Sequence, residues 1–121
     1  MCIRDSNHIA LAGGVDKALK TIAKNADHMT KVSVEVDTLA QLKKVLKYSP
    51  DVVLLDNMGA DKLTKAVAIV DGFKGSRPTL EASGGVNLET VKGLAQTGID
   101  VISIGALTHS TPNFDIGMDA A

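Results

Sequence analysis

The segment Val52-Val-Leu-Leu-Asp-Asn57 is a nearly continuous apolar run that ends in polar residues. Three further runs share this layout, an apolar stretch followed by a polar or glycine-containing turn, at residues 32–37, 79–85 and 101–106. Stretches with helical periodicity separate the runs, so the sequence predicts alternating strands and helices, as in parallel α/β folds. In such folds the carboxyl ends of the strands meet at one edge of the sheet, where functional sites are built.

Four amphipathic helices are predicted around these strands. Thr38 and Gln41 form a capping-box pattern at the start of one helix, and Pro50 follows its end. Asn87 is expected to cap another helix, which Gly98 ends. The apolar residues assigned to the inner sides of the four helices are Val15, Leu19, Ile22 and Ala23; Leu39, Leu42, Val45 and Leu46; Leu63, Ala66, Val67 and Val70; and Leu88, Val91, Leu94 and Ala95.

The apolar character of residues 52–55 and 101–104 indicates a sheet that is covered by helices on one side and by a barrel interior on the other. We therefore expect an α/β fold, a partial parallel (β/α) barrel of about four βα units with right-handed crossovers. Residues 1–6 show no strand period and no cap, which indicates a doubtful or foreign N-terminal segment. A sheet of four units has an open edge that an intact protein would cover.

The composition limits the function. The chain has 121 residues and 45% hydrophobic residues, enough for one domain with a core. Its net charge is −1, with 13 Lys+Arg against 14 Asp+Glu, which provides no field that would favour nucleic acid or an anionic membrane. Only Tyr48, Phe73 and Phe114 are aromatic, too few for a base-stacking platform. A single cysteine, Cys2, excludes an internal disulfide, and with no long apolar run or signal-like start it indicates a cytoplasmic protein.

Two acidic residues are the first candidates for chemistry. Glu35 alternates with Val34 and Val36, so if the valines face helices, Glu35 faces the mouth of the barrel. Asp56 ends the next strand. Together the two carboxylates could hold ribose hydroxyls, stabilise a developing positive charge, or bind Mg²⁺ directly or through water. Alternatively, Asp56 only caps the following helix and Glu35 forms a structural ion pair, but the equivalent positions of the two residues favour a functional role.

Two glycine turns are candidates for a phosphate site. They are Ser83-Gly84-Gly85 and Ile104-Gly105-Ala106, after the last two predicted strands, which is where (β/α) barrels bind phosphate. Glycine lets the backbone approach a ligand, and amides at the start of a helix favour an anion. Tight corners also need glycine for structural reasons alone. His109 follows the second turn and could donate to a phosphate, although a histidine at the start of a helix is as often structural.

Other potential sites are not supported by the sequence. His8, His28 and His109 lack the spacing of metal ligands. Cys2 has no partner base that would make it a catalytic thiol. Gly13-Gly14 lacks the preceding strand and the third glycine of a dinucleotide-binding fingerprint.

Seven motifs, in this order, span residues 7–119: Asn7-His-Ile-Ala10, Val34-Glu-Val-Asp-Thr-Leu39, Leu54-Leu-Asp-Asn-Met58, Leu80-Glu-Ala-Ser-Gly-Gly85, Thr97-Gly-Ile-Asp100, Ile104-Gly-Ala-Leu-Thr-His-Ser110 and Asp115-Ile-Gly-Met-Asp119. With them the chain resembles the C-terminal part of the quinolinate phosphoribosyltransferases, the carboxylating nicotinate-nucleotide pyrophosphorylases. Members of that family are much longer and carry an N-terminal α/β sandwich domain before an incomplete α/β barrel. The resemblance therefore implies that residues 7–121 are the C-terminal part of the barrel catalytic domain.

The resemblance also implies a reaction. In that family the pyridine nitrogen of quinolinate attacks the anomeric carbon of phosphoribosyl pyrophosphate, Mg²⁺-bound pyrophosphate leaves, and loss of carbon dioxide gives nicotinate mononucleotide for NAD biosynthesis. Glu35 and Asp56 match the two acidic residues beside the ribose, and Mg²⁺ is expected to arrive with the substrate, Asp56 being its one possible protein ligand. The residues expected to bind substrate are Ser83, Gly84, Gly85, Ile104, Gly105, Ala106 and His109. Glu81 also falls on a motif position, without a defined role.

The chain departs from the family pattern at its start. Asp5 and Ser6 stand where the family has the Lys and Asp of a Lys-Asp-Asn-His motif, before Asn7 and His8. The basic residues that bind the two carboxylates of quinolinate lie mostly upstream in the family, and one arginine comes from the partner subunit. A carboxylate-lined site without these cations should repel quinolinate. We therefore expect the intact enzyme, a homodimer or higher oligomer, to be active and this chain alone to have little or no activity.

Two alternatives remain open. One is a different barrel enzyme that binds a phosphorylated sugar, and the other is a noncatalytic module that retains the phosphate site. An upstream arginine-rich pocket would distinguish the first from a quinolinate phosphoribosyltransferase. Binding of phosphoribosyl pyrophosphate that does not depend on Asp56 would indicate the second.

Overall fold

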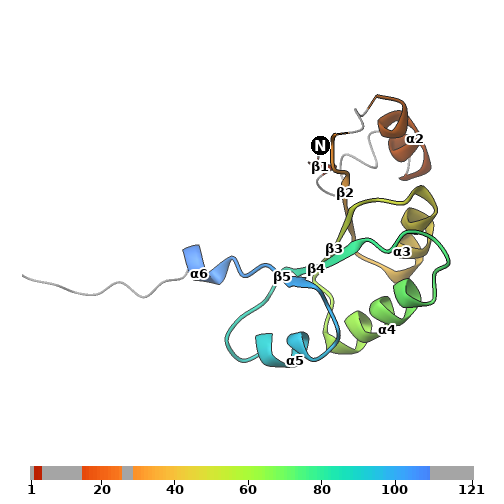
Figure 1. The fold of residues 1–121 in the computed structure, drawn as a ribbon. Coiled ribbons are helices and arrows are strands. Elements are labelled where there is room, and N and C mark those ends of the chain that lie inside the picture. The colour runs from red at the N-terminus through yellow and green to blue at the C-terminus, as the bar shows by residue number, and fades with distance from the viewer. Residues whose placement is uncertain (1, 4–14, 26–28, 110–121) are drawn as a thin grey trace, which may run out of the picture.

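Five parallel strands lie in the order of the sequence, β1-β2-β3-β4-β5, in the computed structural model, which describes residues 2–3, 15–25 and 29–109. The strands are β1 (Cys2–Ile3), β2 (Ser33–Val36), β3 (Val52–Asp56), β4 (Thr79–Ser83) and β5 (Val101–Ile102). The helices are α2 (Val15–Asn25), α3 (Leu39–Val45), the 3₁₀ turn η1 (Leu46–Tyr48), α4 (Ala60–Asp71), α5 (Val91–Ala95) and α6 (Ala106–His109). In Figure 1, α2, α3, α4 and α5 follow one another along one side of the strands. A sequential parallel order with helices on one side is typical of a (β/α) barrel, so the predicted architecture is confirmed.

The two faces of the sheet differ in polarity. The registers place Val34 beside Val53 and Leu80, and all three side chains are fully buried. The next level of this face, formed by Val36, Leu55 and Ala82, is buried as well. On the opposite face Glu35 lies beside Leu54, which lies beside Glu81, and these side chains are only half-buried. Alternate residues therefore face the helical layer and the interior side of the partial barrel.

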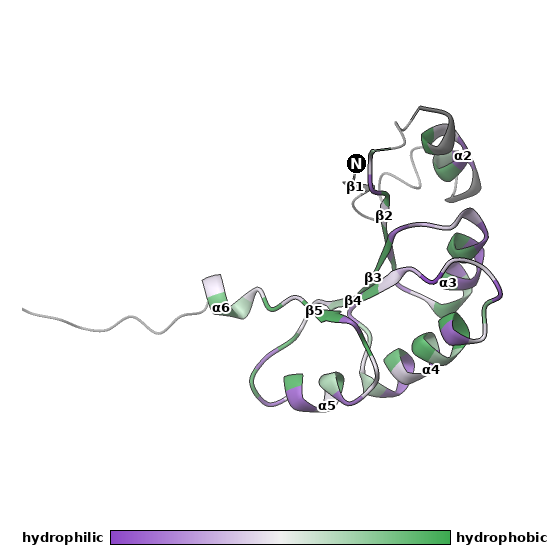
Figure 2. Ribbon diagram, in the orientation of Figure 1, coloured by the Kyte–Doolittle hydropathy of each residue, from purple (hydrophilic) through white to green (hydrophobic). Residues whose placement is uncertain are grey.

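The helices cover the apolar face of the sheet. Figure 2 shows hydrophobic residues along the strands, while α3, α4 and α5 carry both hydrophobic and hydrophilic residues. Leu42 and Val45 of α3 and Leu63, Ala66 and Val70 of α4 are buried in this layer, as the predicted periodicity requires. Within the described residues, no helix combines the length and the apolar character needed to cross a membrane.

The predicted capping box at the start of α3 is confirmed. The hydroxyl of Thr38 accepts a hydrogen bond from the Gln41 N–H at 3.2 Å. The Gln41 side-chain oxygen in turn accepts from the N–H groups of Asp37 and Thr38 at 2.9 and 3.0 Å. These bonds satisfy backbone donors that the helix itself leaves without partners, and a cap of this kind is worth about 1 kcal/mol.

The helix predicted after Asn87 is shorter than expected. The Asn87 Oδ1 accepts from the N–H groups of Glu89 and Thr90, as a cap should, but α5 begins only at Val91. Residues 88–90 form a turn, and Leu88 is 88% exposed, so its predicted inward position is wrong. The hydroxyl of Thr90 also bonds back to Asn87, which holds the turn outside the helix. Gly98, with φ of +85°, follows α5 as predicted.

The start of the chain forms a short strand, although residues 1–6 show no strand period in the sequence. Cys2–Ile3 forms β1 and pairs in parallel with Ser33 and Val34 of β2. Two residues are too few to show an alternating pattern. The foreign origin of this segment stays a prediction, and the motifs at residues 7–10 and 115–119, together with His8 and His28, lie outside the described residues.

Two aspartates accept backbone hydrogen bonds at the amino ends of the strands. Asp51, just before β3, accepts a hydrogen bond at its Oδ2 from the N–H of Val32, just before β2, at 2.7 Å. Asp100, just before β5, accepts one at its Oδ2 from the N–H of Leu80 in β4 at 2.8 Å. Both carboxylates satisfy a backbone donor at the edge of the sheet that lies away from the predicted site.

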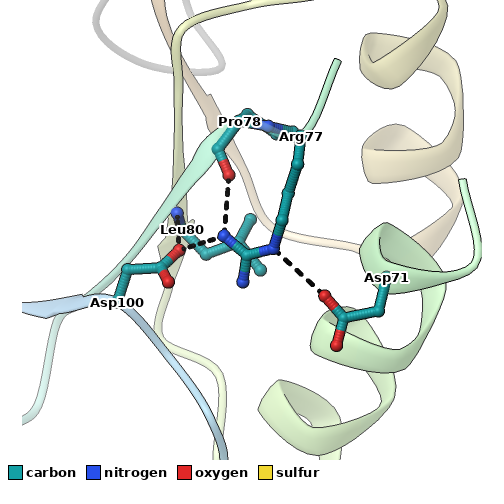
Figure 3. A network of polar contacts seen from close by, with 5 residues as sticks. All are labelled: Asp71, Arg77, Pro78, Leu80 and Asp100. Atoms are coloured by element: carbon teal, nitrogen blue, oxygen red, sulfur yellow. Dashed lines mark hydrogen bonds and ion pairs between the residues drawn. The ribbon is translucent and has the colours of Figure 1, made fainter. Parts of the chain in front are cut away.

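Arg77 completes the contacts around Asp100 (Figure 3). Its Nη1 donates to Asp100 Oδ2 at 2.8 Å, and its Nε donates to Asp71 Oδ1 at 3.1 Å, at the end of α4. The hydrogen bond from Arg77 lowers the pKa of Asp100; partial burial opposes this, and the Leu80 N–H lowers it further. Arg77 therefore connects the start of β4 to both α4 and β5.

We expect Asp100→Asn to lower the free energy of unfolding by up to about 1 kcal/mol at pH 7, because the pair with Arg77 is partly exposed and screened. A carboxylate whose pKa is lowered by folding stabilises the fold above its unfolded pKa and loses this effect as pH falls through the folded pKa. The difference between wild type and variant should therefore be complete above about pH 4, shrink as the pH falls further, and vanish only below the lowered pKa of Asp100. Urea denaturation at several pH values measures the difference.

Asp71→Asn is the matched control, because Asp71 also pairs with Arg77 but its side chain is 55% exposed. It should have a smaller effect than Asp100→Asn. A stability difference for Asp100→Asn that does not change with pH would contradict the assigned role of the charge.

Candidate functional site

Three carboxylates converge at the carboxyl ends of β2 and β3. One oxygen each from Glu35, Asp37 and Asp56 lies within 4.8 Å of the other two. Glu35 and Asp37 are two residues apart and so lie on the same face, and the register brings Asp56 beside them. Glu35 and Asp56 are half-buried, whereas Asp37 is exposed. The expected convergence of Glu35 and Asp56 is thus present, and their roles stay a prediction.

Asp56 does not cap the helix that follows it. The N-cap of α4 is Gly59, which has no side chain to bond the helix. Asp56 Oδ2 instead accepts from Asn57 Nδ2 at 2.9 Å. Asn57 has φ of +50°, a left-handed conformation that asparagine tolerates, and its N–H donates to Ser83 O at 2.9 Å. The hydrogen bond from Asn57 to Ser83 therefore connects the end of β3 to β4. The structural alternative, in which Asp56 caps α4, is wrong.

The acidic cluster suits a hard cation. Its three donors are all carboxylate oxygens, which are the ligands that Mg²⁺ and Ca²⁺ prefer. Their mutual distance of at most 4.8 Å also places their negative charges close together, an arrangement that a cation relieves. The donor set therefore fits a divalent metal ion.

A pocket of about 390 Å³ lies beside this cluster, at the carboxyl ends of β4 and β5. It brings together both predicted glycine turns and the predicted histidine. The lining residues are Ser83, Gly84, Gly85, Val86, Ser103, Gly105, Ala106 and His109. Ile104, also predicted to bind substrate, is not among them; it is half-buried and packs against the hydrophobic core.

Gly84 connects the pocket to the acidic cluster. Its φ is +83°, a conformation that side chains disfavour. A Cβ atom at this position would lie 2.6 Å from Asn57 Oδ1 and 2.7 Å from Asp56 Oδ1. Only glycine lets the turn after β4 approach the end of β3 this closely, so the two parts of the site have a fixed spacing.

The pocket can hold an anion through its backbone. Neither Lys nor Arg occurs among the described residues that line it, and His109 is the one lining side chain that can become cationic. The His109 ring lies against Gly105, since a Cβ there would be 3.0 Å from His109 Nε2. Glycine turns with exposed amides, supported by a histidine, are a common way to bind a phosphate group.

Sequence reasoning missed two residues of the site. Asp37 follows Glu35 at a spacing of two, so strand alternation would have placed both carboxylates on one face. Ser103 follows Val101 in the same way, one residue beyond the end of β5, and it lines the pocket together with Ser83. Both residues lie one position beyond the end of their strand, and strand alternation continues past that end.

Comparisons with known proteins identify the family. The family model described as "Quinolinate phosphoribosyl transferase, C-terminal domain" matches residues 1–119. A probable carboxylating nicotinate-nucleotide pyrophosphorylase of Methanocaldococcus jannaschii is 35% identical over 116 residues, covering 93% of this chain and 41% of the relative. The carboxylating nicotinate-nucleotide pyrophosphorylase of Mycobacterium leprae is 40% identical over 113 residues, covering 93% of this chain and 39% of the relative.

A solved structure agrees with these matches. The crystal structure of nicotinate-nucleotide pyrophosphorylase from Ehrlichia chaffeensis superposes with a TM-score of 0.85 and 40% sequence identity, covering 98% of this chain and 41% of that chain. The chain thus spans about two fifths of the length of the relatives it matches. The match over residues 1–119 shows that the chain belongs to the quinolinate phosphoribosyltransferase family and corresponds to its C-terminal domain.

Proposed function

We propose that this chain is the C-terminal part of an enzyme that transfers the phosphoribosyl group of phosphoribosyl pyrophosphate to quinolinate, with decarboxylation to nicotinate mononucleotide in NAD biosynthesis. One observation carries the proposal: the carboxylates of Glu35 and Asp56 converge beside a pocket that two glycine turns form. The names of the relatives, carboxylating nicotinate-nucleotide pyrophosphorylases, support the same reaction.

The two parts of the site suit the two parts of a phosphorylated ribose. The 5-phosphate binds in the pocket against Gly84, Gly85 and Gly105, and the ribose ring extends toward Glu35 and Asp56. Ionised carboxylates accept hydrogen bonds from ribose hydroxyls. They also stabilise the positive charge that develops on the ring as the bond to pyrophosphate breaks.

Mg²⁺ fits this scheme, with Glu35, Asp37 and Asp56 as the residues that would hold it. When bound, it supplies positive charge that balances the charge of the pyrophosphate group. The residues of this chain bind and orient the sugar and place negative charge next to its anomeric carbon. The glycine turns keep the phosphate at a fixed distance from that carbon.

Quinolinate recognition is expected to need residues from elsewhere. The inner face carries Glu35, Asp56 and Glu81, and a substrate with two carboxylates would be repelled there without added cations. We propose that the missing cations come from the rest of the longer enzyme and from a second subunit, in a homodimer or higher oligomer. A cytoplasmic location is part of the same proposal.

The sharpest test is the binding of phosphoribosyl pyrophosphate in the presence of Mg²⁺, measured by isothermal titration. Asp56→Asn should weaken binding by at least about tenfold, because it removes a charge from the cluster that faces the ribose and the metal. Asp61→Asn is the matched control, since Asp61 is an exposed aspartate in the first turn of α4. Equal binding by wild type and Asp56→Asn would contradict the proposal and leave only an anion-binding module.

Gly84→Ala should abolish binding of the same substrate. The new methyl group strains the turn at φ of +83° and pushes against Asp56 Oδ1, so it disturbs both parts of the site. The control is Gly85→Ala, which also has positive φ but whose Cβ comes no closer than 3.6 Å to Asn57 Oδ1. Both variants should lose about 1 kcal/mol of stability from backbone strain. Equal effects of the two variants on binding would show that the contact with Asp56 has no role.

The isolated chain should form little or no nicotinate mononucleotide from quinolinate and phosphoribosyl pyrophosphate. A chimera in which residues 7–121 replace the matching segment of the Mycobacterium leprae relative should form the product, because the rest of that protein then supplies the residues that the chain lacks, those at positions 5 and 6 included. Product formation is followed by chromatography. A rate for the isolated chain close to that of the full-length relative would contradict this expectation, and so would a folded chimera that binds substrate but is inactive.

A further inference from the structure

Glu81 is a carboxylate on the inner face of the sheet that the proposed chemistry does not use. In β4 it lies beside Leu54, and Leu54 lies beside Glu35, so these three residues form one row across the sheet. Asp56 and Ser83 form the row nearer the carboxyl ends of the strands. Glu81 is therefore one row below the pocket that we assign to phosphate, and it is half-buried.

A hydrogen bond connects Glu81 to the pocket. Glu81 Oε1 accepts from the hydroxyl of Ser103, a residue that lines the pocket. The backbone of Ser103 is fixed as well, because its N–H donates to Ala82 O at 2.9 Å. A serine hydroxyl has one proton and two lone pairs. With its proton directed at Glu81, Ser103 can only accept a hydrogen bond from a molecule in the pocket.

We propose that Glu81 is a positioning residue that acts through Ser103. Because Ser103 directs its proton at Glu81, the Ser103 side of the pocket, which we call its floor, accepts a hydrogen bond from a sugar hydroxyl and disfavours phosphate oxygens. The dianion of a phosphate monoester has only acceptor oxygens, which find no donor at Ser103 and do find donors in the amides of the glycine turns. A sugar hydroxyl can donate to Ser103. The pocket thus has a donor wall at Gly84, Gly85 and Gly105 and an acceptor floor at Ser103.

This arrangement of donors and acceptors orients the ligand. The inference rests on the proposal that the pocket holds a phosphorylated sugar. The phosphate is confined to the glycine wall, and the sugar lies across the inner face. The dianion of a simple phosphate ester such as methyl phosphate has no hydroxyl group and gains nothing from the floor. The site should therefore prefer a sugar phosphate to methyl phosphate.

The test compares the affinities of the 121-residue chain for ribose 5-phosphate and for methyl phosphate, measured by NMR titration at about pH 8, where both phosphate groups are dianions. Wild type should prefer ribose 5-phosphate. In Ser103→Ala this preference should fall about three- to tenfold through weaker binding of ribose 5-phosphate, and Ser103→Thr, which keeps a hydroxyl, should retain it. In Glu81→Ala the Ser103 proton is released, so the preference should fall through tighter binding of methyl phosphate.

Glu89→Ala is the control, because Glu89 is an exposed glutamate in the turn before α5. A ratio of two affinities does not change when a variant merely loses stability, so it separates positioning from folding, and Ser103→Ala alone suffices if Glu81→Ala does not fold. An unchanged ratio in Ser103→Ala, with binding of both probes intact, would overturn this inference but not the proposed function. Failure of wild type to bind either probe would overturn the inference and count against the phosphate pocket itself.

Discussion

The two-residue alternation of β2, β3 and β4, held in one register, is the constraint on which both the core and the site depend. Val34, Val53 and Leu80 share a level on the face that the helices cover, and they are fully buried. The same register brings Glu35 and Asp56 to the opposite face, at the ends of adjacent strands. A slip of one residue would put a carboxylate into the helical layer and a leucine into the site. The register that buries the core therefore also sets the positions of Glu35 and Asp56.

The two edges of the sheet have different tasks. At the amino ends, Asp51 accepts a hydrogen bond from the backbone of Val32. Asp100 accepts one from the backbone of Leu80 and pairs with Arg77, which also bonds Asp71 of α4 (Figure 3). At the carboxyl ends the backbone turns through glycines and leaves a pocket. Because hydrogen bonds stabilise the sheet at the amino ends of its strands, strained and close turns such as that at Gly84 are tolerated at the carboxyl ends. The candidate site therefore lies at the carboxyl ends of the strands, away from the hydrogen bonds that connect the strands at their amino ends.

Much of this arrangement follows from local signals, and the exceptions have physical reasons. The long apolar runs, the capping box at Thr38 and the glycine turns are each defined by neighbouring residues, and they were predictable. The pair of Arg77 with Asp100 spans 23 positions, so it depends on strand order, which no local pattern encodes. Leu88 fits a helical stripe, but the side-chain hydrogen bonds of Asn87 and Thr90 hold it in a turn. Asp37 and Ser103 join the site because strand alternation continues beyond the strand ends.

The account makes one central claim, that the acids at the ends of β2 and β3 and the glycine turns after β4 and β5 hold the two parts of one phosphorylated ribose. The crystal structure of the chain soaked with ribose 5-phosphate tests it most directly. We predict phosphate density against the amides of Gly84, Gly85 and Gly105, with the ribose ring directed toward Glu35 and Asp56. Phosphate density at another place on the surface, or a ribose directed away from the two carboxylates, would contradict the account.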